Sequence, residues 1–276
     1  MTSTSTTTTV TAPLPSLGRV SRERAVLELK SEVRNPMSMA FTLLFPVMML
    51  LLFGAVFSGA VNNTSGVTNS QLFVAGIIGS SILSTGFVGL AIGIAIERDK
   101  GQLKRLAGTP MPKAAYFLGK IASVLALAAG QIVVLALLGV ALFDVELPTS
   151  ASKWFTFAWV FVLGIAAATL LGVAIGGLLP NGKSAPAILN LPYVALQFIS
   201  GVFVPFNELP DSLRTVAGVF PLRWLCQGMR SVFLPDSFQE VEQSHSWQHP
   251  TMAIVLLAWC VLGTILCLRT FRFTTD

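Results

Sequence analysis

Residues 72–96, LFVAGIIGSSILSTGFVGLAIGIAI, decide the fold of this chain. All 25 residues are apolar or small, and none carries a charged side chain. A bilayer core is about 30 Å thick, and a helix rises about 1.5 Å per residue, so about 20 apolar residues cross it. The stretch therefore predicts a helix that spans a membrane.

Five more apolar stretches of comparable length lie along the chain. They are residues 37–57, 114–143, 155–179, 185–203 and 251–268. Hydrophobic residues make up 53% of the 276 residues and charged residues 11%, which is about half of the usual charged share in a soluble domain. We therefore predict an all-α, polytopic membrane protein with six transmembrane helices, in which residues 19–276 form a single domain.

The placement of the basic residues predicts the orientation. The net charge is +5. Of the 18 basic residues, 13 lie in the first, third, fifth and last of the segments that flank the spans, and Lys120 lies near the start of the third span. The other four are Lys153, Arg214, Arg223 and Arg230. Loops rich in Lys and Arg stay in the cytoplasm. We therefore expect both termini in the cytoplasm and the chain in the plasma (inner) membrane. This interpretation makes the basic residues topology signals and not a nucleic-acid-binding surface.

The N-terminal tail, residues 1–18, is rich in Thr, Ser and Pro and carries no charged side chain. Such a composition provides too little apolar surface to bury a core, so the tail is predicted to be disordered. No basic segment followed by a short apolar run stands at its start, and a cleaved signal peptide is not expected.

A second segment, residues 22–35, lies between the tail and the first span. Its helical spacing puts apolar and charged residues on opposite faces, which predicts an amphipathic helix at the inner membrane surface. A cytosolic extension of the first span is the alternative, but Pro36 disfavours helical geometry at Asn35. The apolar face has Val26, Leu29 and Val33, and the charged face has Arg24, Glu28 and Glu32.

Ionisable side chains are almost absent from the six stretches. The exception is Lys120, close enough to the inner end of the third stretch for its ammonium to reach the interface. Charged residues within a membrane usually mark ion or proton pathways, so their scarcity argues against an ion-coupled carrier. Serines such as Ser80, Ser81 and Ser84 have no histidine within the membrane, which argues against a serine hydrolase.

Residues 177–184, GLLPNGKS, match the phosphate-loop pattern letter by letter. A true phosphate loop follows a buried strand in a soluble α/β domain, whereas this segment lies at a tight turn between two spans. Pro180, Asn181 and Gly182 are typical turn residues. We therefore expect no nucleotide site in this chain.

His245 and His249 have the i, i+4 spacing of two metal ligands, with Glu240 and Glu242 nearby. No glutamate stands between the two histidines as it does in the zinc-protease motif, so a polar external loop is favoured over a metal site. The three cysteines, Cys226, Cys260 and Cys267, do not have a metal-binding spacing. No cofactor is therefore expected on this chain.

Small residues recur at every fourth position in two spans. Such ladders let helix backbones approach closely in a bilayer. They would serve packing within the subunit or a seam between two subunits, and the sequence does not choose between these. The residues are Gly164, Ala168, Gly172 and Gly176 in the fourth span, and Gly76, Ser80 and Ser84 in the second.

Two loops hold more pattern than a simple connection needs. Residues 97–112, ERDKGQLKRLAGTPMP, predict a short amphipathic cytosolic helix that is a docking point for a soluble partner, or else a charged turn that only fixes topology. Residues 200–230 are half apolar but interrupted by Pro205, Pro210 and Pro221. They predict short re-entrant helices between spans five and six, which are tolerated where protein buries the backbone.

Three motifs, taken in their order along the six predicted spans, resemble those of the ABC-2 family of permeases, the membrane subunits of ATP-binding-cassette exporters. The resemblance covers residues 22–272 and is nearest to drug-exporter permeases of the daunorubicin-resistance type. It rests on Arg34-Asn35-Pro36, on Glu97-Arg98, Gly101, Leu103, Leu106 and Thr109-Pro110, and on Ser200-Gly201, Pro205, Leu209-Pro210, Pro221-Leu222 and Arg230.

The resemblance implies a permease that is not itself an enzyme. Two ATPase subunits would carry ATP and Mg and dock on this chain, and a second permease subunit, identical or homologous, would pair with it among the membrane lipids. The substrate would be an amphipathic drug, a lipid or a lipid-linked molecule.

The implied docking residues are Glu28, Arg34, Glu97, Arg98, Lys100, Gly101, Leu103, Leu106, Thr109 and Pro110. The implied outer motif is Ser200, Gly201, Pro205, Leu209, Pro210, Pro221 and Arg230. The substrate path would follow spans one, two and five, with Phe198 and Phe203 as candidates.

Two other functions compete with export. A membrane scaffold or sensor would recruit a soluble partner through the same basic inner loops. A membrane enzyme would use His245, His249 and Glu240 at the outer surface.

Overall fold

The computed structural model describes residues 16–35, 39–57, 66–109, 111–204, 206–242 and 244–270. All regular elements within these ranges are helices, in agreement with the predicted all-α class. Most of the predicted disordered tail, residues 1–15, lies outside the described residues, and so do Pro36, Pro110 and Pro205. The last residues of that tail, Leu17 and Gly18, belong to the first helix instead.

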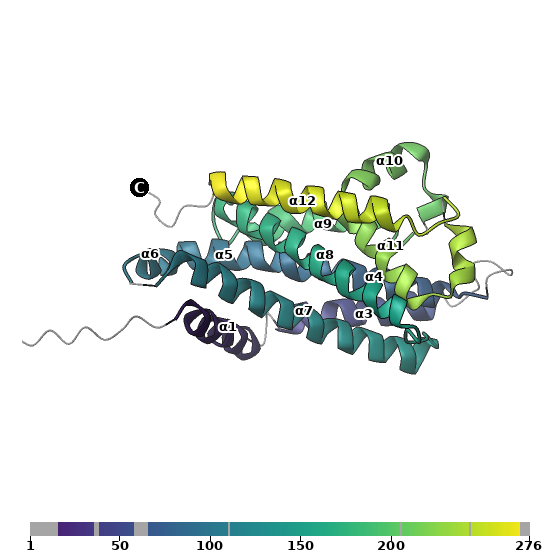
Figure 1. Cartoon of the computed structure of the whole chain (residues 1–276), viewed down its shortest axis with the longest axis horizontal. Coiled ribbons are helices and arrows are strands. Elements are labelled where there is room, and N and C mark those ends of the chain that lie inside the picture. Colours follow the sequence, from purple (N-terminus) through teal and green to yellow (C-terminus); the bar gives the residue numbers. More distant parts are fainter. Residues whose placement is uncertain are drawn as a thin grey trace, which may run out of the picture.

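Four long apolar helices in the described part of the chain are long enough to cross a membrane. They run side by side along the length of the molecule (Figure 1). They correspond to the predicted second, third, fourth and sixth spans, with ends that differ by a few residues. They are the continuous helix Asn69–Asp99, α7 (Lys113–Phe143), α8 (Ala151–Leu178) and α12 (His249–Thr270).

The predicted first and fifth spans are shorter helices. The first comprises the π-helical turn η1 (Ala40–Leu44) and α3 (Phe45–Val56), and the fifth is α9 (Ala185–Ile199). The prediction extended the fifth helix to residue 203, but α9 ends at Ile199 because Gly201 takes a left-handed conformation with φ +79°. The count of six spans therefore stays a prediction.

The helix Asn69–Asp99 forms the centre of the bundle and has three parts. They are α4 (Asn69–Leu83), the π-helical η2 (Ser84–Gly89) and α5 (Leu90–Asp99). Thr68 and Gln71 form a capping box at its start. Most of its side chains are buried by neighbouring helices. This central position makes it the link between the two ends of the molecule.

The ladders of small residues pack inside the subunit. A methyl group at Gly172 would lie 2.6 Å from the carbonyl oxygen of Gly86, and one at Gly176 would lie 2.9 Å from that of Ala91. In the second span, a methyl group at Gly76 would lie 3.2 Å from Val202. The structure thus resolves the alternative left open by the sequence, because the subunit's own helices already cover these faces.

Gln131 of α7 joins the two π-helical turns in the middle of the bundle. Its side-chain oxygen accepts a hydrogen bond from the Thr85 hydroxyl of η2 at 2.7 Å. Its amide nitrogen donates to the carbonyl oxygen of Thr42 in η1, also at 2.7 Å. A π-helical turn disturbs the regular pairing of a helix and is often found at functional positions. This bridge ties the first, second and third predicted spans together.

The remaining short helices divide between the two ends of the bundle (Figure 1). α1 (Leu17–Arg34) and α6 (Gln102–Ala107) lie at the end where α12 finishes. The opposite end carries η3 (Phe206–Glu208), α10 (Asp211–Val219), α11 (Pro221–Phe233) and η4 (Asp236–Val241). The predicted short helices between spans five and six are therefore present. All 13 residues of α11 are buried against the bundle, as a re-entrant segment requires. Their depth in a membrane stays a prediction.

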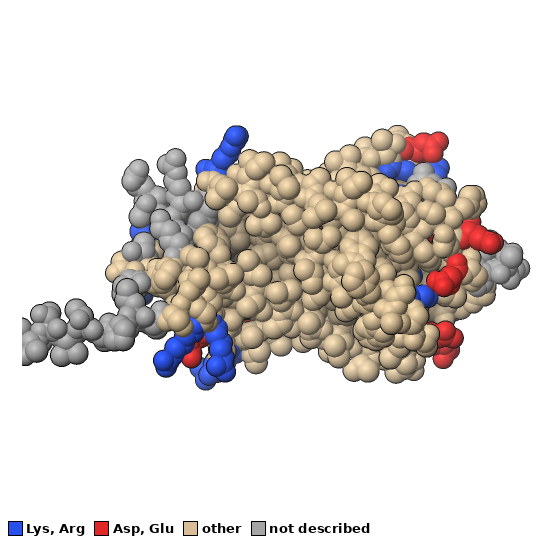
Figure 2. Space-filling view, in the orientation of Figure 1, with Lys and Arg blue, Asp and Glu red and all other residues tan. Residues whose placement is uncertain are grey.

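Charged side chains gather at the two ends, and the middle of the visible face is free of them (Figure 2). Lys and Arg dominate around α1 and the end of α12, whereas most of the visible Asp and Glu lie at the opposite end. This distribution fits a membrane protein whose basic end, defined as the end with α1 and α6, faces the cytoplasm. The side of the membrane remains a prediction.

Candidate functional site

The short helix α6 stands at the basic end, directly after α5. Gly101 separates the two helices with φ +68°, a left-handed conformation that glycine adopts without strain. Lys104 and Arg105 are exposed on α6, whereas Leu103 is only 3% exposed. Leu103 was predicted at the docking surface, but its side chain packs inside its own subunit. It anchors α6 to its own subunit, so the basic residues form the accessible side.

A buried cluster of charges ties three helices together behind α6. The Lys120 ammonium of α7 lies 2.8 Å from a Glu28 carboxylate oxygen of α1 and also contacts the Glu97 carboxylate of α5. The Tyr116 hydroxyl donates to Glu97 at 2.8 Å, and Arg24 pairs with Glu28. Buried charges are stable only when they are paired and hydrogen-bonded. The cluster therefore fixes α1 and α5 to α7.

This cluster corrects two predictions. Lys120 was expected to extend its ammonium to the interface, but it is 5% exposed and held between two carboxylates. Glu97 and Glu28 were expected at a docking surface, but their carboxylates point into the subunit, where Lys120 needs them. Both residues would therefore position the docking region from inside.

The helix α1 packs on α7 with its charged face and leaves part of its apolar face exposed, as the predicted contact with a membrane surface requires. Glu28 is buried against α7, whereas Val26 and Val33 are exposed, Val33 to 61%. Gly119 of α7 allows the close approach, because a methyl group there would lie 2.7 Å from Cβ of Arg24. The predicted helix is present, and its inner face combines the Glu28 ion pair with Lys120 and the buried Ala25. Its place at the membrane surface stays a prediction.

The end of α5 also holds the turn between α8 and α9. The Arg98 guanidinium donates to the carbonyl oxygens of Gly177, at 2.8 Å, and Leu179. The Asp99 carboxylate accepts the backbone N–H of Gly182 at 2.6 Å. The last carbonyl groups of a helix lack partners within it and favour a cation. Arg98 supplies that cation to α8, so it is not free for a partner as predicted.

The phosphate-loop-like segment is part of this turn. It follows α8, a helix and not a strand, and it leads into α9. The Gly182 N–H that a phosphate loop would offer to an anion already binds Asp99. A methyl group at Gly182 would lie 3.0 Å from Cα of Ile96, so this glycine serves close packing. The geometry agrees with the expectation of a turn.

Three of the remaining predicted docking residues, Arg34, Lys100 and Thr109, are exposed. Arg34 ends α1, and Lys100 and Thr109 flank α6, with the Thr109 hydroxyl donating to the carbonyl oxygen of Leu106 at 2.7 Å. Leu106 is half-buried. The surface presented by α6 is therefore small, polar and basic.

At the opposite end, the structure brings parts of the predicted outer motif together. Arg230 of α11 lies 2.7 Å from a Glu242 carboxylate oxygen and donates to the carbonyl oxygen of Gly201 at 3.3 Å. Both members of this ion pair are buried. Arg223 stacks on the Phe206 ring at 4.1 Å, and burial lowers the pKa of its guanidinium to about 10. Arginines thus hold the loop after α9 against α11.

The other predicted outer residues are structural. Pro210 immediately precedes α10, and Pro221 opens α11, the position where proline costs a helix least. Leu209 packs with Phe206 and Ala217 in a small apolar cluster, and Ser200 is fully buried. The sequence indicated Glu242 only as a neighbour of the two histidines and did not reveal its pairing with Arg230, although a buried arginine requires an acidic partner.

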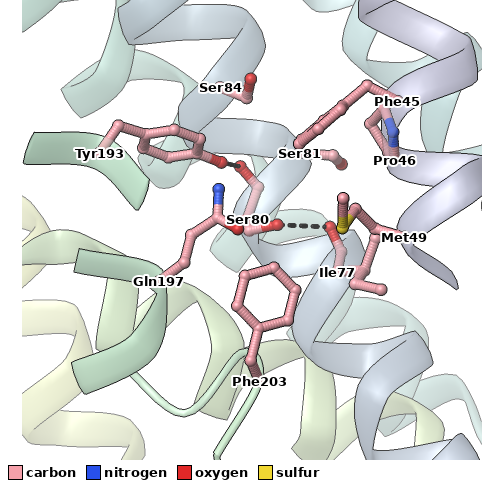
Figure 3. A pocket seen from close by; sticks show the side chains of 10 residues that line it. All are labelled: Phe45, Pro46, Met49, Ile77, Ser80, Ser81, Ser84, Tyr193, Gln197 and Phe203. Carbon is pink, nitrogen blue, oxygen red and sulfur yellow. Dashed lines mark hydrogen bonds between the residues drawn. The ribbon is translucent and has the colours of Figure 1, made fainter. Parts of the chain in front are cut away.

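A small cavity of about 20 Å³ lies between α3, α4 and α9 (Figure 3). This volume holds about one water molecule. The Tyr193 hydroxyl donates to the carbonyl oxygen of Ser80 at 2.8 Å, and Phe203 closes one side. Phe198 is exposed beside it, with its ring centroid 5.3 Å from that of Phe203. The lining is Phe45, Pro46, Met49, Ile77, Ser80, Ser81, Ser84, Tyr193, Gln197 and Phe203, without a charged side chain.

The two histidines lie apart from any cluster of ligands. His245 contacts the carbonyl oxygen of Glu240. His249, the first residue of α12, lies 3.2 Å from the hydroxyl of Ser231 in α11. Within the described ranges, no three His, Cys, Asp or Glu side chains converge on a point that would suit a metal ion.

Comparison with known proteins supplies the family. The family model described as ABC-2 type transporter matches residues 26–234, which is most of the chain. The chain belongs to the ABC-2 type transporter family. This ABC-2 permease is therefore the transmembrane component of an ABC transporter and is not itself the catalytic subunit. Its family implies partnership with an ABC ATPase subunit.

Individual relatives agree with this assignment. Two of them are named as putative transport permeases: ycf38 from Cyanophora paradoxa is 26% identical, over 78% of this chain and 73% of its own, and YvfS from Bacillus subtilis is 24% identical, over 73% and 80%. The ABC transporter G family member 53 from Oryza sativa subsp. japonica is 26% identical over 71% of this chain, which is 14% of that protein's length.

Proposed function

We propose that this ABC-2 permease is the membrane subunit of an ATP-driven exporter, with ATP and Mg bound by two separate ATPase subunits that dock at the basic end. The observation that carries this proposal is the mounting of α6. Its outward side is polar and exposed, while Leu103, Arg98 and Asp99 fasten it and the end of α5 to the bundle. A partner that moves α6 would therefore move the helices behind it.

Motion would pass from α6 into the bundle along two routes. The first runs through α5 into the central helix, which Gln131 ties to α7 and η1. The second runs through Glu97 and Lys120 to α1. Because both routes consist of paired polar groups in a packed interior, a displacement at α6 would be transmitted without being absorbed by loose segments.

Export also requires a path for the substrate through the membrane. The cavity between α3, α4 and α9 supports a path next to Phe203. Its lining combines aromatic and aliphatic side chains with neutral hydroxyl and amide groups, which suits an amphipathic drug, a lipid or a lipid-linked substrate. The two short helices α3 and α9 beside it expose apolar side chains, including Met48 and Leu191. We place a second permease subunit, identical or homologous, against this face.

The orientation completes the proposal. The basic end faces the cytoplasm of the plasma membrane, with both termini on that side, because Lys and Arg are retained there. Substrate would leave the cytoplasm or the inner leaflet toward the opposite end.

The test is to purify the tagged chain from its native membrane in a mild detergent and to assay ATP hydrolysis by whatever co-purifies. We expect an ATPase subunit and an activity that amphipathic compounds change. A Gly101→Val variant should lose the ATPase, because a β-branched residue does not tolerate the left-handed conformation at the α5–α6 junction.

Gly93→Val is the matched control, since Gly93 faces open space on α5. A folded permease that carries no ATPase in repeated preparations would contradict the exporter and would favour the scaffold or sensor that recruits a different soluble partner.

A further inference from the structure

We propose that the turn between α8 and α9 forms one docking surface together with α6, and that the ATPase subunit presents an acidic surface to it. This basic surface consists of Lys100, Lys104, Arg105 and Lys183. The inference rests on the proposed function, since it names the chemistry of the partner face that the exporter would use.

The two parts of the basic surface are joined by short hydrogen bonds. Asp99 accepts the N–H of Gly182 at 2.6 Å. Lys100 follows Asp99 and Lys183 follows Gly182, so both lysines lie next to this contact. Arg98 fastens the same turn through the carbonyl oxygens of α8. The turn and α6 therefore meet a partner as one surface.

The acidic side chains of this region are already engaged. Residues 97–109 and 179–184 contain two acids, Glu97 and Asp99. Glu97 holds Lys120 and Tyr116, and Asp99 holds Gly182. Lys100, Lys104, Arg105 and Lys183 are exposed and form no ion pair with any residue that the structure describes. The surface thus carries four uncompensated positive charges.

If these four basic residues served only to set the membrane topology, their charges would be enough. Their arrangement on one surface would not be needed. The exposed Arg19, Arg22 and Lys30 on α1 already mark the same end as basic. Two loops far apart in sequence, fastened to each other with their cations outward, are instead typical of a surface complementary to an acidic partner. Such complementarity raises association rates and makes binding sensitive to salt.

The experiment measures the affinity of the purified permease for the ATPase subunit recovered with it, at several salt concentrations. The test variant is Lys104→Gln/Arg105→Gln/Lys183→Gln. The matched control, Arg19→Gln/Arg22→Gln/Lys30→Gln, removes the same charge from the same end of the molecule. Thermal unfolding and cysteine labelling of each variant verify that fold and orientation are kept.

We expect affinity for the parent chain to fall with rising salt. The test variant should bind about tenfold more weakly and with a flatter salt dependence, because each lost pair contributes a modest amount. The control should stay within about twofold, on the same reasoning. Lys183→Glu alone should weaken binding by about threefold or more, on the same estimate per pair, which assigns the α8–α9 turn to the surface.

Three results would overturn the inference alone: binding to the parent that is insensitive to salt, equal losses in the test and control variants, or no effect of Lys183→Glu. Failure of the parent chain to bind any ATPase would overturn the proposed function, and this inference with it.

Discussion

Lys120 holds two carboxylates from different helices, so removing its charge leaves Glu97 without a cation and Glu28 with Arg24 alone. Lys120→Met should lower the stability of the permease by about 3–5 kcal/mol, the usual cost of leaving one side of a buried ion pair uncompensated. Thermal unfolding in detergent measures the change. The double variant Lys120→Met/Glu97→Gln should recover most of the loss, because Glu97 is then neutral and Glu28 keeps its ion pair with Arg24.

An unfolding temperature of Lys120→Met equal to that of the parent would show that the carboxylates find water or other cations, and the cluster would then not position α1.

Gln131 is another residue whose side chain makes polar contacts with two other helices of the bundle. Gln131→Leu should cost about 1 kcal/mol, the usual scale for a hydrogen-bonding side chain between membrane helices. We expect a larger effect on coupling than on stability, because the bridge joins η1 to η2. The ratio of transport to ATP hydrolysis in reconstituted vesicles tests this. Thr264→Val on the exposed side of α12, which removes a hydrogen bond within that helix alone, is a suitable control.

At the basic end, the sequence predicted the positions of the motif residues better than it predicted their contacts. The motif order singled out Glu97, Arg98 and Leu103, and the structure places all three at the α5–α6 junction. Their contacts within the subunit were not predicted, because a carboxylate or guanidinium on a loop looks solvent-exposed until its partner is known. Lys120 and Gly182 lie far from that loop in sequence, and no local pattern connects them to it.

Helices in this bundle approach each other through glycines, and α4 and α11 give the sharpest case. A methyl group at Gly79 would lie 2.8 Å from the backbone nitrogen and Cα of Cys226. Gly79→Ala should therefore push the two helices apart at a cost of about 1–3 kcal/mol, the usual range for overpacking. Gly93→Ala, in open space on α5, should be neutral or slightly stabilising. Comparing the unfolding temperatures of the two variants tests this, and equal values would contradict the close α4–α11 contact.

Long apolar runs located the four long helices within a few residues because length and composition alone determine whether a helix can cross a bilayer. The end of α9 was predicted wrongly, and the sequence did not show which face of α1 packs on the bundle. In α9 the left-handed Gly201 ends the helix, although apolar residues continue to Phe203. In α1 the buried Glu28 faces inward, since an ion pair outweighs the apolar stripe. Both outcomes depend on tertiary contacts that periodicity does not contain.

The orientation of the whole molecule can be tested with single cysteines and a membrane-impermeant thiol reagent. Gln102→Cys lies at the basic end and Ser237→Cys at the opposite end, and both positions are exposed. We expect Gln102→Cys to react only from the cytoplasmic side and Ser237→Cys only from outside. The half-buried native Cys260 and Cys267 are replaced by serine in this and the following experiment. The native Cys226 does not interfere, because burial raises the pKa of its thiol to about 12, so it stays protonated and unreactive at neutral pH. Labelling of both positions from the same side would contradict the proposed topology.

The helices α3 and α9, which line the same cavity and are shorter than the bilayer core is thick, are the strongest reason for a second subunit. α9 has 15 residues and is about 22 Å long, which falls short of the bilayer core, and α3 beside it is no longer. Pairing two copies along this face would shield the short helices from lipid. A Leu191→Cys variant should therefore form a cross-linked dimer with a flexible bis-maleimide in native membranes. Leu268→Cys on α12 is the control: the native side chains are 77% and 81% exposed, so lipid alone would treat the two positions alike. Cross-linking at Leu268 but not at Leu191 would move the seam to α12 and remove the cavity beside Phe203 from the subunit interface.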